Sequence, residues 1–237
     1  MANYLPKTTL EQSHASISNK LLNSCYSLSI VEKRILLLTL AKIDSSSKLD
    51  KDSWCSMSVA DYASLCNVSK KDAYDTLKAA SLQLFERYFI LKGLSTPKSE
   101  QRCRWVDAIE VVPEEGIVRV RWSVSILPLI AELEEKFSKL FMLDVMRING
   151  IYASRLFDML YQEKWHGKQG SKQVAVAELI TNWSIPVSCQ PFGELKRSIL
   201  NPAIKELEKK ELVRVEMRVG KKKGKTIDSV VFDYWFS

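Results

Sequence analysis

The chain has 237 residues, of which 46% are hydrophobic and 27% charged, a composition typical of a folded protein rather than of a disordered tail. Its formal net charge of +7 favours polyanionic partners, with nucleic acid ahead of a membrane surface. No apolar run approaches the roughly 20 residues that span a bilayer, and the N-terminus lacks the features of a signal peptide. We therefore expect a cytoplasmic protein without a membrane partner.

Neither the cysteines nor the histidines form a metal-binding pattern. The five cysteines are scattered, never in a Cys-x-x-Cys pair, at positions Cys25, Cys55, Cys66, Cys103 and Cys189. The two histidines, His14 and His166, are far apart in the sequence. We expect reduced thiols, no metal and no cofactor.

In chain order, residues 1–19 are polar and aperiodic and predict a mobile arm. A helix is expected to open at Ser29, where Glu32 completes a capping-box pattern, and to end at residues 44–47. From this arm onward we predict an N-terminal domain over residues 20–143 and a C-terminal domain over residues 144–237.

A helix-turn-helix is predicted in the first domain. Residues 58–66 form its first helix, and Ser69 with Asp72 repeats the capping pattern at the start of the second. The buried face of the second helix is expected at Ala73, Leu77, Ala80 and Leu84. Its exposed basic residues are Lys70, Lys71 and Lys78, which either contact DNA or form a solvated face beside acidic neighbours.

The middle of the chain predicts strands and then helices. Residues 105–112 and 117–122 read as two strands joined by a turn at residues 113–116. A long helix is expected to run through Leu129, Leu133, Phe137 and Phe141. A further helix is expected to contain Tyr152, Leu156, Met159 and Leu160.

Residues 191–225 hold most of the positive charge. Eleven lysines and arginines against five glutamates give this stretch a balance of +6, nearly all of the chain's net charge. It begins with an amphipathic helix whose apolar stripe is Phe192, Leu195, Ile199, Leu200, Ala203 and Leu207. On the opposite face we expect Arg197, Ser198, Asn201 and Lys205, types that contact phosphates or base edges. Arg197 either pairs with a guanine or is a solvated surface arginine, and Asn201 either reads an adenine or caps the turn before Pro202. Lys196 lies by helical angle on the apolar side and is also a candidate phosphate contact.

A basic hairpin follows this helix. Alternation from Val213 to Val219 predicts a strand that returns over residues 227–232. The tip carries Lys221, Lys222, Lys223 and Lys225, which either straddle phosphates or only keep a turn soluble. A helix followed by such a hairpin is the outline of a winged helix.

The two halves of the chain look alike. Residues 59–62 and 176–179 have similar sequences, and each is followed by a turn, a helix with basic residues, and strands. This weak repeat favours an α+β fold with two tandem winged-helix domains, although amphipathic helices beside hairpins occur in many α+β folds.

Short segments in a fixed order extend through nearly the whole chain. They are residues 19–28 leading into 32–34, 61–62 with 74–77, 104–106, 152–160, 192–207, and 224–225 through 232. On these segments the sequence resembles the replication initiator (Rep) proteins of iteron-containing plasmids, from about residue 19 to residue 236.

The resemblance implies tandem winged helices and sequence-specific binding of double-stranded DNA. Monomers of such proteins bind direct repeats at an origin, help to open the duplex, and recruit the host initiator and replicative helicase. Homodimers repress the initiator's own promoter at an inverted repeat. The family's C-terminal winged helix is the main repeat reader. Its N-terminal winged helix contacts the DNA backbone and provides dimer contacts, for which the candidates here are Val118 and Val120.

Two other function classes compete with this interpretation. An enzyme is disfavoured because the sequence has no Gly-rich phosphate loop, no Gly-x-Ser-x-Gly, no His-Glu-x-x-His and no clustered histidines for a relaxase metal. A winged-helix transcriptional repressor without origin function needs the same groove-reading surface. Only the arrangement of its DNA target separates it from an initiator.

Overall fold

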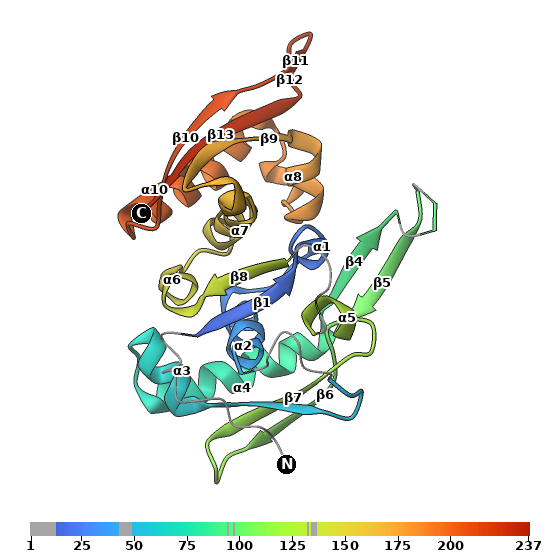
Figure 1. Ribbon diagram of the computed structural model, residues 1–237, viewed down its shortest axis with the longest axis vertical. Coiled ribbons are helices and arrows are strands. Elements are labelled where there is room, and N and C mark those ends of the chain that lie inside the picture. The colour runs from blue at the N-terminus through green and yellow to red at the C-terminus, as the bar shows by residue number, and fades with distance from the viewer. Residues whose placement is uncertain (1–12, 43–48, 94, 97, 132, 134–136) are drawn as a thin grey trace. The chain divides into compact units, whose positions relative to one another are not determined.

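The computed structural model describes residues 13–42, 49–93, 95–96, 98–131, 133 and 137–237. The chain folds into two compact units, each assembled from separate stretches of sequence (Figure 1). Unit 1 contains residues 13–18, 31–87 and 103–147, and unit 2 contains residues 19–30, 88–102 and 148–237. The domain boundaries expected from the sequence stay a prediction. The compact units divide the chain differently because two N-terminal segments pack with the C-terminal part.

Unit 1 combines helices with two small antiparallel sheets. Its helices are α2 (Ile30–Leu40), α3 (Val59–Cys66), α4 (Lys70–Glu86), α5 (Leu127–Ile130) and α6 (Met142–Arg147). One sheet has the order β3-β7-β6, with β3 (Trp54–Ser58), β6 (Val106–Val112) and β7 (Ile117–Trp122). The other pairs β1 (His14–Ser18) with β8 (Phe137–Phe141). In the described residues no helix is both long and apolar enough to cross a membrane.

The predicted helix-turn-helix is confirmed as α3 and α4, and its caps explain its boundaries. The hydroxyl of Ser58 accepts a hydrogen bond from the backbone N–H of Asp61 at 2.9 Å, which caps α3. Ser69 accepts from the backbone N–H of Asp72 at 3.1 Å and donates to its carboxylate at 2.7 Å. Between the two helices, Asn67 adopts a left-handed conformation with φ of 52°. The buried positions of α4 are those predicted, namely Ala73, Leu77, Ala80 and Leu84.

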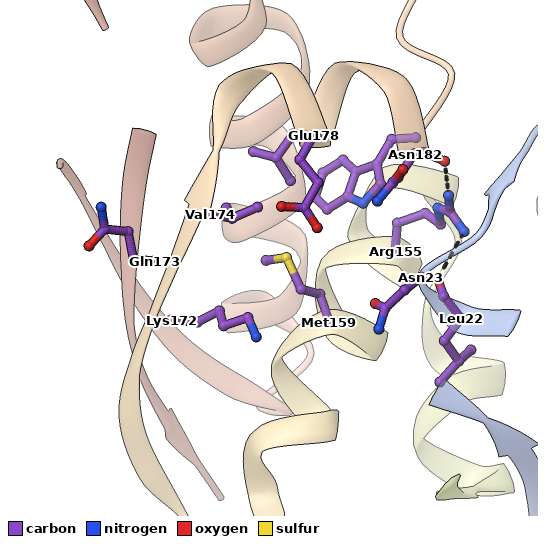
Figure 2. Close-up of a pocket in the computed structure, with 11 residues that line it drawn as sticks. Leu22, Asn23, Arg155, Met159, Lys172, Gln173, Val174, Glu178 and Asn182 are labelled. Atoms are coloured by element: carbon purple, nitrogen blue, oxygen red, sulfur yellow. Dashed lines mark hydrogen bonds between the residues drawn. The ribbon is translucent and has the colours of Figure 1, made fainter. Parts of the chain in front are cut away.

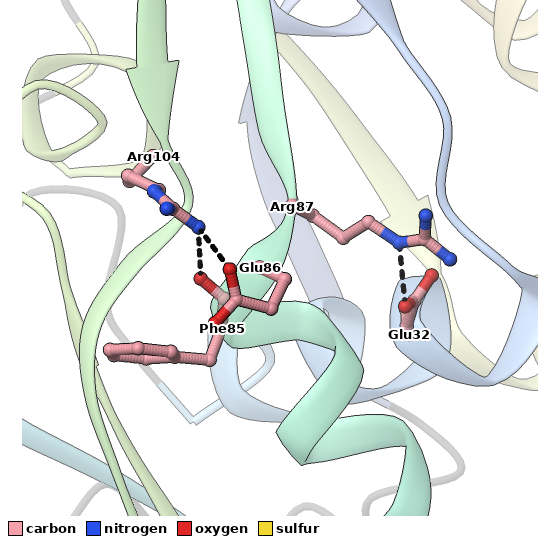
Figure 3. A network of polar contacts seen from close by, with 5 residues as sticks. All are labelled: Glu32, Phe85, Glu86, Arg87 and Arg104. Atoms are coloured by element: carbon pink, nitrogen blue, oxygen red, sulfur yellow. Dashed lines mark hydrogen bonds and ion pairs between the residues drawn. The ribbon is translucent and has the colours of Figure 1, made fainter.

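Two arginines hold the C-terminal end of α4 in unit 1 (Figure 3). The Nε of Arg87 donates to the carboxylate of Glu32, a fully buried side chain, at 2.9 Å. Arg104 donates to the backbone carbonyl of Phe85 at 2.8 Å and to the carboxylate of Glu86 at 3.2 Å. The last carbonyls of a helix lack partners within the helix, and Arg104 provides a partner for one of them. Its positive charge also interacts favourably with the negative end of the helix dipole.

Two predictions for unit 1 are wrong because strand pairing overrides local pattern. The long helix expected through Leu129 and Phe141 is only the short α5, and the chain then forms β8. β8 pairs with β1, which uses the end of the arm predicted to be mobile, with His14 opposite Phe141 and Ser18 opposite Phe137. Residues 1–12, and the helix end predicted at residues 44–47, lie outside the described residues.

The candidate dimer contacts Val118 and Val120 are buried within the single chain, and their role in a dimer stays a prediction. Their side chains are 1% and 0% exposed. β7 is the central strand of its sheet, so both of its edges are already paired, with β3 and with β6. The alternating burial of β7 places both valines on the face of the strand that packs against α4.

Unit 2 contains the second winged helix. Its helical elements are α1 (Asn19–Leu22), α7 (Ile151–Tyr161), η2 (Gln162–His166), α8 (Val176–Asn182), η3 (Val187–Cys189), α9 (Phe192–Glu194), the π-helical turn η4 (Leu195–Leu200) and α10 (Asn201–Lys209). The main sheet has the order β10-β13-β9, with β9 (Gln169–Ala175), β10 (Val213–Val219) and β13 (Ser229–Phe236). A small ladder pairs β11 (Lys222–Lys223) with β12 (Thr226–Ile227), and β2 (Cys25–Tyr26), β4 (Tyr88–Lys92) and β5 (Glu100–Arg104) form a further sheet.

Arg155 of α7 anchors the N-terminal segment within unit 2 (Figure 2). Its side chain is buried, and its guanidinium donates to the backbone carbonyls of Leu22, Ser24 and Asn182. It also lies over the ring of Tyr26, 3.6 Å from the ring centroid. A single side chain thus joins α1, β2 and the end of α8 to α7.

Both units combine helices with antiparallel sheets, which confirms the predicted α+β class.

Candidate nucleic-acid interface

The amphipathic segment of the second winged helix forms one continuous helical run, α9–η4–α10, which we call the recognition helix. Its inward side packs on unit 2 through the predicted stripe of Leu195, Ile199, Leu200, Ala203 and Leu207, all buried. Phe192, at the start of the stripe, is half-buried. This packing leaves the opposite side of the helix in solvent.

The recognition helix widens before Pro202. The backbone N–H of Asn201 donates to the carbonyl of Lys196, five residues back, which is the hydrogen bond of a π-helix. Pro202 has no N–H to donate, and its ring would crowd the carbonyl of Ser198 in a regular α-helix. A wide π-helical turn therefore accommodates Pro202 within the helical run.

The wide turn explains where Lys196 lies. The α-helical angle placed Lys196 on the apolar side, but its side chain is exposed, because α-helical spacing does not hold through η4. The five candidate residues of this helix are all exposed, namely Lys196, Arg197, Ser198, Asn201 and Lys205. Their DNA contacts stay predictions.

Arg197 forms an ion pair with an acidic neighbour on the same helix. Its side chain is 75% exposed, and Nη2 donates to the carboxylate of Glu194 at 2.7 Å. The hydroxyl of Ser198 donates to the same carboxylate at 3.4 Å. The hydrogen bond from Arg197 holds the pKa of Glu194 below its ordinary value, so this carboxyl stays ionised at neutral pH. A guanidinium has five N–H donors, and Glu194 occupies only part of that capacity.

The hairpin after the recognition helix carries four exposed lysines at its tip. The wing, which we define as residues 220–229, begins where the N–H of Gly220 donates to the carbonyl of Ser229 at 2.9 Å. The buried hydroxyl of Ser229 accepts from the N–H of Lys221 at 2.8 Å and fixes the base of the wing. At the tip, Gly224 has φ of 62° in the two-residue loop between β11 and β12, the positive φ that a type II′ turn requires at its first position. Figure 1 shows β11 and β12 beyond the ends of β10 and β13.

The wing lysines therefore extend from a fixed base. They are Lys221, Lys222, Lys223 and Lys225, and all four are exposed. Because the backbone at the base is hydrogen-bonded to Ser229, the lysines form a defined cluster of positive charge on unit 2.

Two arginines on β10 were not among the predicted site residues. Arg214 and Arg218 point to the exposed face of the sheet, with side chains 68% and 60% exposed. Arg218 donates to Asp233 at 2.8 Å and lowers the pKa of that carboxyl, and Arg214 lies over the ring of Trp235 at 5.2 Å. The sequence does indicate these two positions. Val213, Val215 and Met217 alternate with a period of two, which places the residues between them on the exposed face of the sheet.

In unit 1, Lys70, Lys71 and Lys78 are exposed on α4 as expected. Lys70 and Lys71 belong to the first turn, and the ammonium of Lys78 lies 6.0 Å from the ring centroid of Tyr74. The exposed face of the first helix-turn-helix is therefore available to a ligand, and a DNA role for these lysines stays a prediction.

Within the ranges that the structure describes, no group of three or more His, Cys, Asp or Glu side chains could hold a metal ion. Burial raises the pKa of the Cys55 thiol to about 11 and also raises that of Cys66, so both are protonated at neutral pH.

A cavity of about 220 Å³ in unit 2 is lined by Met159, Lys172, Trp183 and other residues (Figure 2). Lys172 is paired there with Glu163 at 2.5 Å, and Arg155 is engaged by backbone carbonyls.

Comparisons with known proteins match nearly the whole chain. The family model described as "Initiator Replication protein, WH1" matches residues 15–161, and "Initiator Rep protein, WH2" matches residues 175–234. The "PI protein" of Escherichia coli is 24% identical over 245 residues, covering 91% of this chain and 80% of that protein. A "Replication initiation protein" of Escherichia coli is 22% identical over 219 residues, covering 91% of this chain and 67% of that protein.

A solved structure has the same fold. The crystal structure of Pi initiator protein in complex with iteron DNA aligns with a TM-score of 0.80 and 22% identity, covering 96% of this chain and 98% of that chain. The likeness includes both winged-helix domains, in agreement with the two family models. The chain therefore belongs to the family of plasmid replication initiator (Rep) proteins.

Proposed function

We propose that this chain is a sequence-specific double-stranded DNA-binding protein that initiates plasmid replication by binding direct repeats, or iterons, at the origin. The observation that carries the proposal is one winged helix with an exposed polar recognition helix and a lysine-tipped wing, in a chain of the initiator family. The similarity to a Pi initiator protein solved with iteron DNA supports the choice of ligand.

In this proposal the recognition helix enters the major groove. Arg197 exchanges Glu194 for the O6 and N7 acceptors of a guanine, which its planar fork matches bidentately. Asn201 is placed to contact adenine, while Lys196, Ser198 and Lys205 contact phosphates that fix the register of the helix. The wing lysines neutralise phosphates beside the groove.

The more specific activities that we propose are those that membership of the family implies. We propose that monomers load on the repeats, help to open the duplex, and recruit the host initiator and helicase. A dimer represses the initiator's own promoter at an inverted repeat. The chain acts by binding rather than by catalysis, in the bacterial cytoplasm. The dimer contacts proposed at Val118 and Val120 concern side chains that are buried within the single chain.

Arg197→Ala is expected to lower affinity for the specific site by about 1–3 kcal/mol and to relax the preference at one base position. The reason is that a neutral methyl group leaves the guanine acceptors unpaired, whereas contacts to phosphates are kept. The measurement is a titration with two duplexes. One is selected by the wild-type chain from a random library, and the other is a scrambled duplex of equal length and composition.

Arg214→Ala is the matched control, because it removes an equally exposed arginine at the end of β10 that is remote from the wing. It is expected to weaken both duplexes slightly and equally. An equal loss on both duplexes for Arg197→Ala would show that this arginine does not read bases. Failure of the wild-type chain to select any duplex would contradict sequence-specific binding itself.

A further inference from the structure

A carboxylate on the recognition helix caps the start of another helix. Glu206 of α10 accepts a hydrogen bond from the backbone N–H of Asn149 at 2.6 Å. It also accepts from the N–H of Gly150 through both carboxylate oxygens, each at 3.1 Å. Gly150 is the N-cap residue of α7 and has no side chain to cap the helix itself. The recognition helix therefore supplies the cap of α7.

The hydrogen bonds to Glu206 depend on direction, so they restrict how α10 is oriented against α7. The first N–H groups of a helix have no partner within the helix, and they lie at the positive end of its dipole. A carboxylate that accepts several such bonds is charge-assisted and therefore stronger than a neutral pair. Apolar packing of Leu207 and Ala203 resists separation of the helices, but it is not directional. The Glu206 contact fixes the rotation of α10 about its own axis.

Gly150 has the backbone of an ordinary residue, with φ of −85° and ψ of 130°. A Cβ added there would nevertheless lie 2.5 Å from Oε2 of Glu206. Glycine therefore leaves room for the close approach of the carboxylate, which a Cβ would force to shift, and is not needed for an unusual backbone conformation. Alanine at position 150 would displace the carboxylate without removing its charge.

The recognition helix needs such a link because its own ladder is irregular. The π-helical turn at Leu195–Leu200 and the missing N–H of Pro202 interrupt the regular hydrogen bonding between Arg197 and Lys205. Glu206 lies directly after this interruption and next to Lys205. It ties the C-terminal half of the helix to the start of α7 by hydrogen bonds, while Glu208 accepts a longer one, at 3.3 Å, from the backbone N–H of Val215 in β10.

We propose that Glu206, together with Gly150, is a positioning device for DNA recognition. It holds the recognition helix at the angle at which its exposed side chains meet base edges, without contacting DNA itself. This inference rests on the proposed function. Base contacts depend on orientation, whereas phosphate contacts by flexible lysines do not, so the device controls discrimination between sequences rather than total affinity.

The test compares Glu206→Gln, Gly150→Ala and the double variant. Binding is titrated on a duplex that the wild-type chain selects from a random library and on a scrambled duplex. Each single variant is expected to reduce the ratio of the two affinities about tenfold, the cost of misaligning one bidentate base contact. The double variant is expected to lose no more than either single variant, because both changes break the same contact. The salt dependence on scrambled DNA stays unchanged in Gly150→Ala.

Glu211→Gln is the control, because it removes the same charge from an exposed residue just beyond α10. It should leave the ratio unchanged. The free energy of unfolding is measured for every variant, and affinities are corrected for the folded fraction. A ratio that stays at the wild-type value in both single variants overturns the inference. A wild-type chain that binds the two duplexes equally overturns the proposed function instead.

Discussion

Replacing all four wing lysines, Lys221, Lys222, Lys223 and Lys225, by alanine is expected to weaken binding to every duplex by on the order of a thousandfold at about 0.1 M salt. Each lysine that neutralises a phosphate releases condensed counterions, which contributes about 0.9 to the slope of log affinity against log salt. Four such contacts give a slope change between about 3 and 4. The measurement is a salt titration on selected and scrambled duplexes.

The alanine variant should leave the fold of the hairpin unchanged. The lysines are exposed, and the base of the wing is held by Ser229 and the backbone of Lys221, so truncation at the tip leaves the hydrogen bonds of the hairpin in place. The fourfold replacement by arginine is the matched control, because it keeps the charge and should keep the slope. An alanine variant with the wild-type slope would show that the wing does not contact phosphates.

Arg155→Leu is expected to lower the free energy of unfolding by about 3 kcal/mol. The buried guanidinium satisfies the backbone carbonyls of Leu22, Ser24 and Asn182, and all three lose this donor in the variant. Leu22 and Ser24 are buried residues, and Asn182 is half-buried. Each buried acceptor left unpaired costs about 1–3 kcal/mol. The loss of an expensive buried charge offsets part of this sum. Denaturant titration measures the effect.

Because Arg155 joins α1 and β2 to α7, the same variant should be cleaved faster by protease within residues 19–30. Arg214→Leu is the control, since this side chain is 68% exposed and surface substitutions change stability by less than about 0.5 kcal/mol. A loss below about 1 kcal/mol for Arg155→Leu, with residues 19–30 still protected, would show that Arg155 does not anchor the segment.

Local signals sufficed for the elements that present candidate residues. Capping by Ser58 and Ser69 is encoded within four residues, so α3 and α4 could be predicted with their buried faces. The amphipathic stripe ending at Leu207 and the glycine-flanked lysine tip likewise depend on neighbours in sequence. The exposed face with Arg197 and Lys205 follows directly from that stripe.

The features that sequence reasoning missed depend on partners distant in the chain. β8 forms because residues 14–18 pair with it, and apolar residues such as Phe137 and Phe141 fit a helical period equally well. The burial of Val118 and Val120 follows from the pairing of β7 on both edges. Glu206 offers no local signal, since in the sequence it is simply one of the two acidic residues of α10, and its contact with α7 depends on the tertiary fold.

The most direct test of the account is a nuclease footprint of the purified wild-type chain on the DNA that flanks its coding region. Several protected segments with the same sequence in the same orientation and even spacing are expected, and methylation of guanine N7, which lies in the major groove, should be blocked at guanines within them. Absence of any protected segment at moderate ionic strength would contradict the account. Protection of an inverted repeat alone, with no direct repeats protected, would also contradict it, because that pattern belongs to a repressor without origin function.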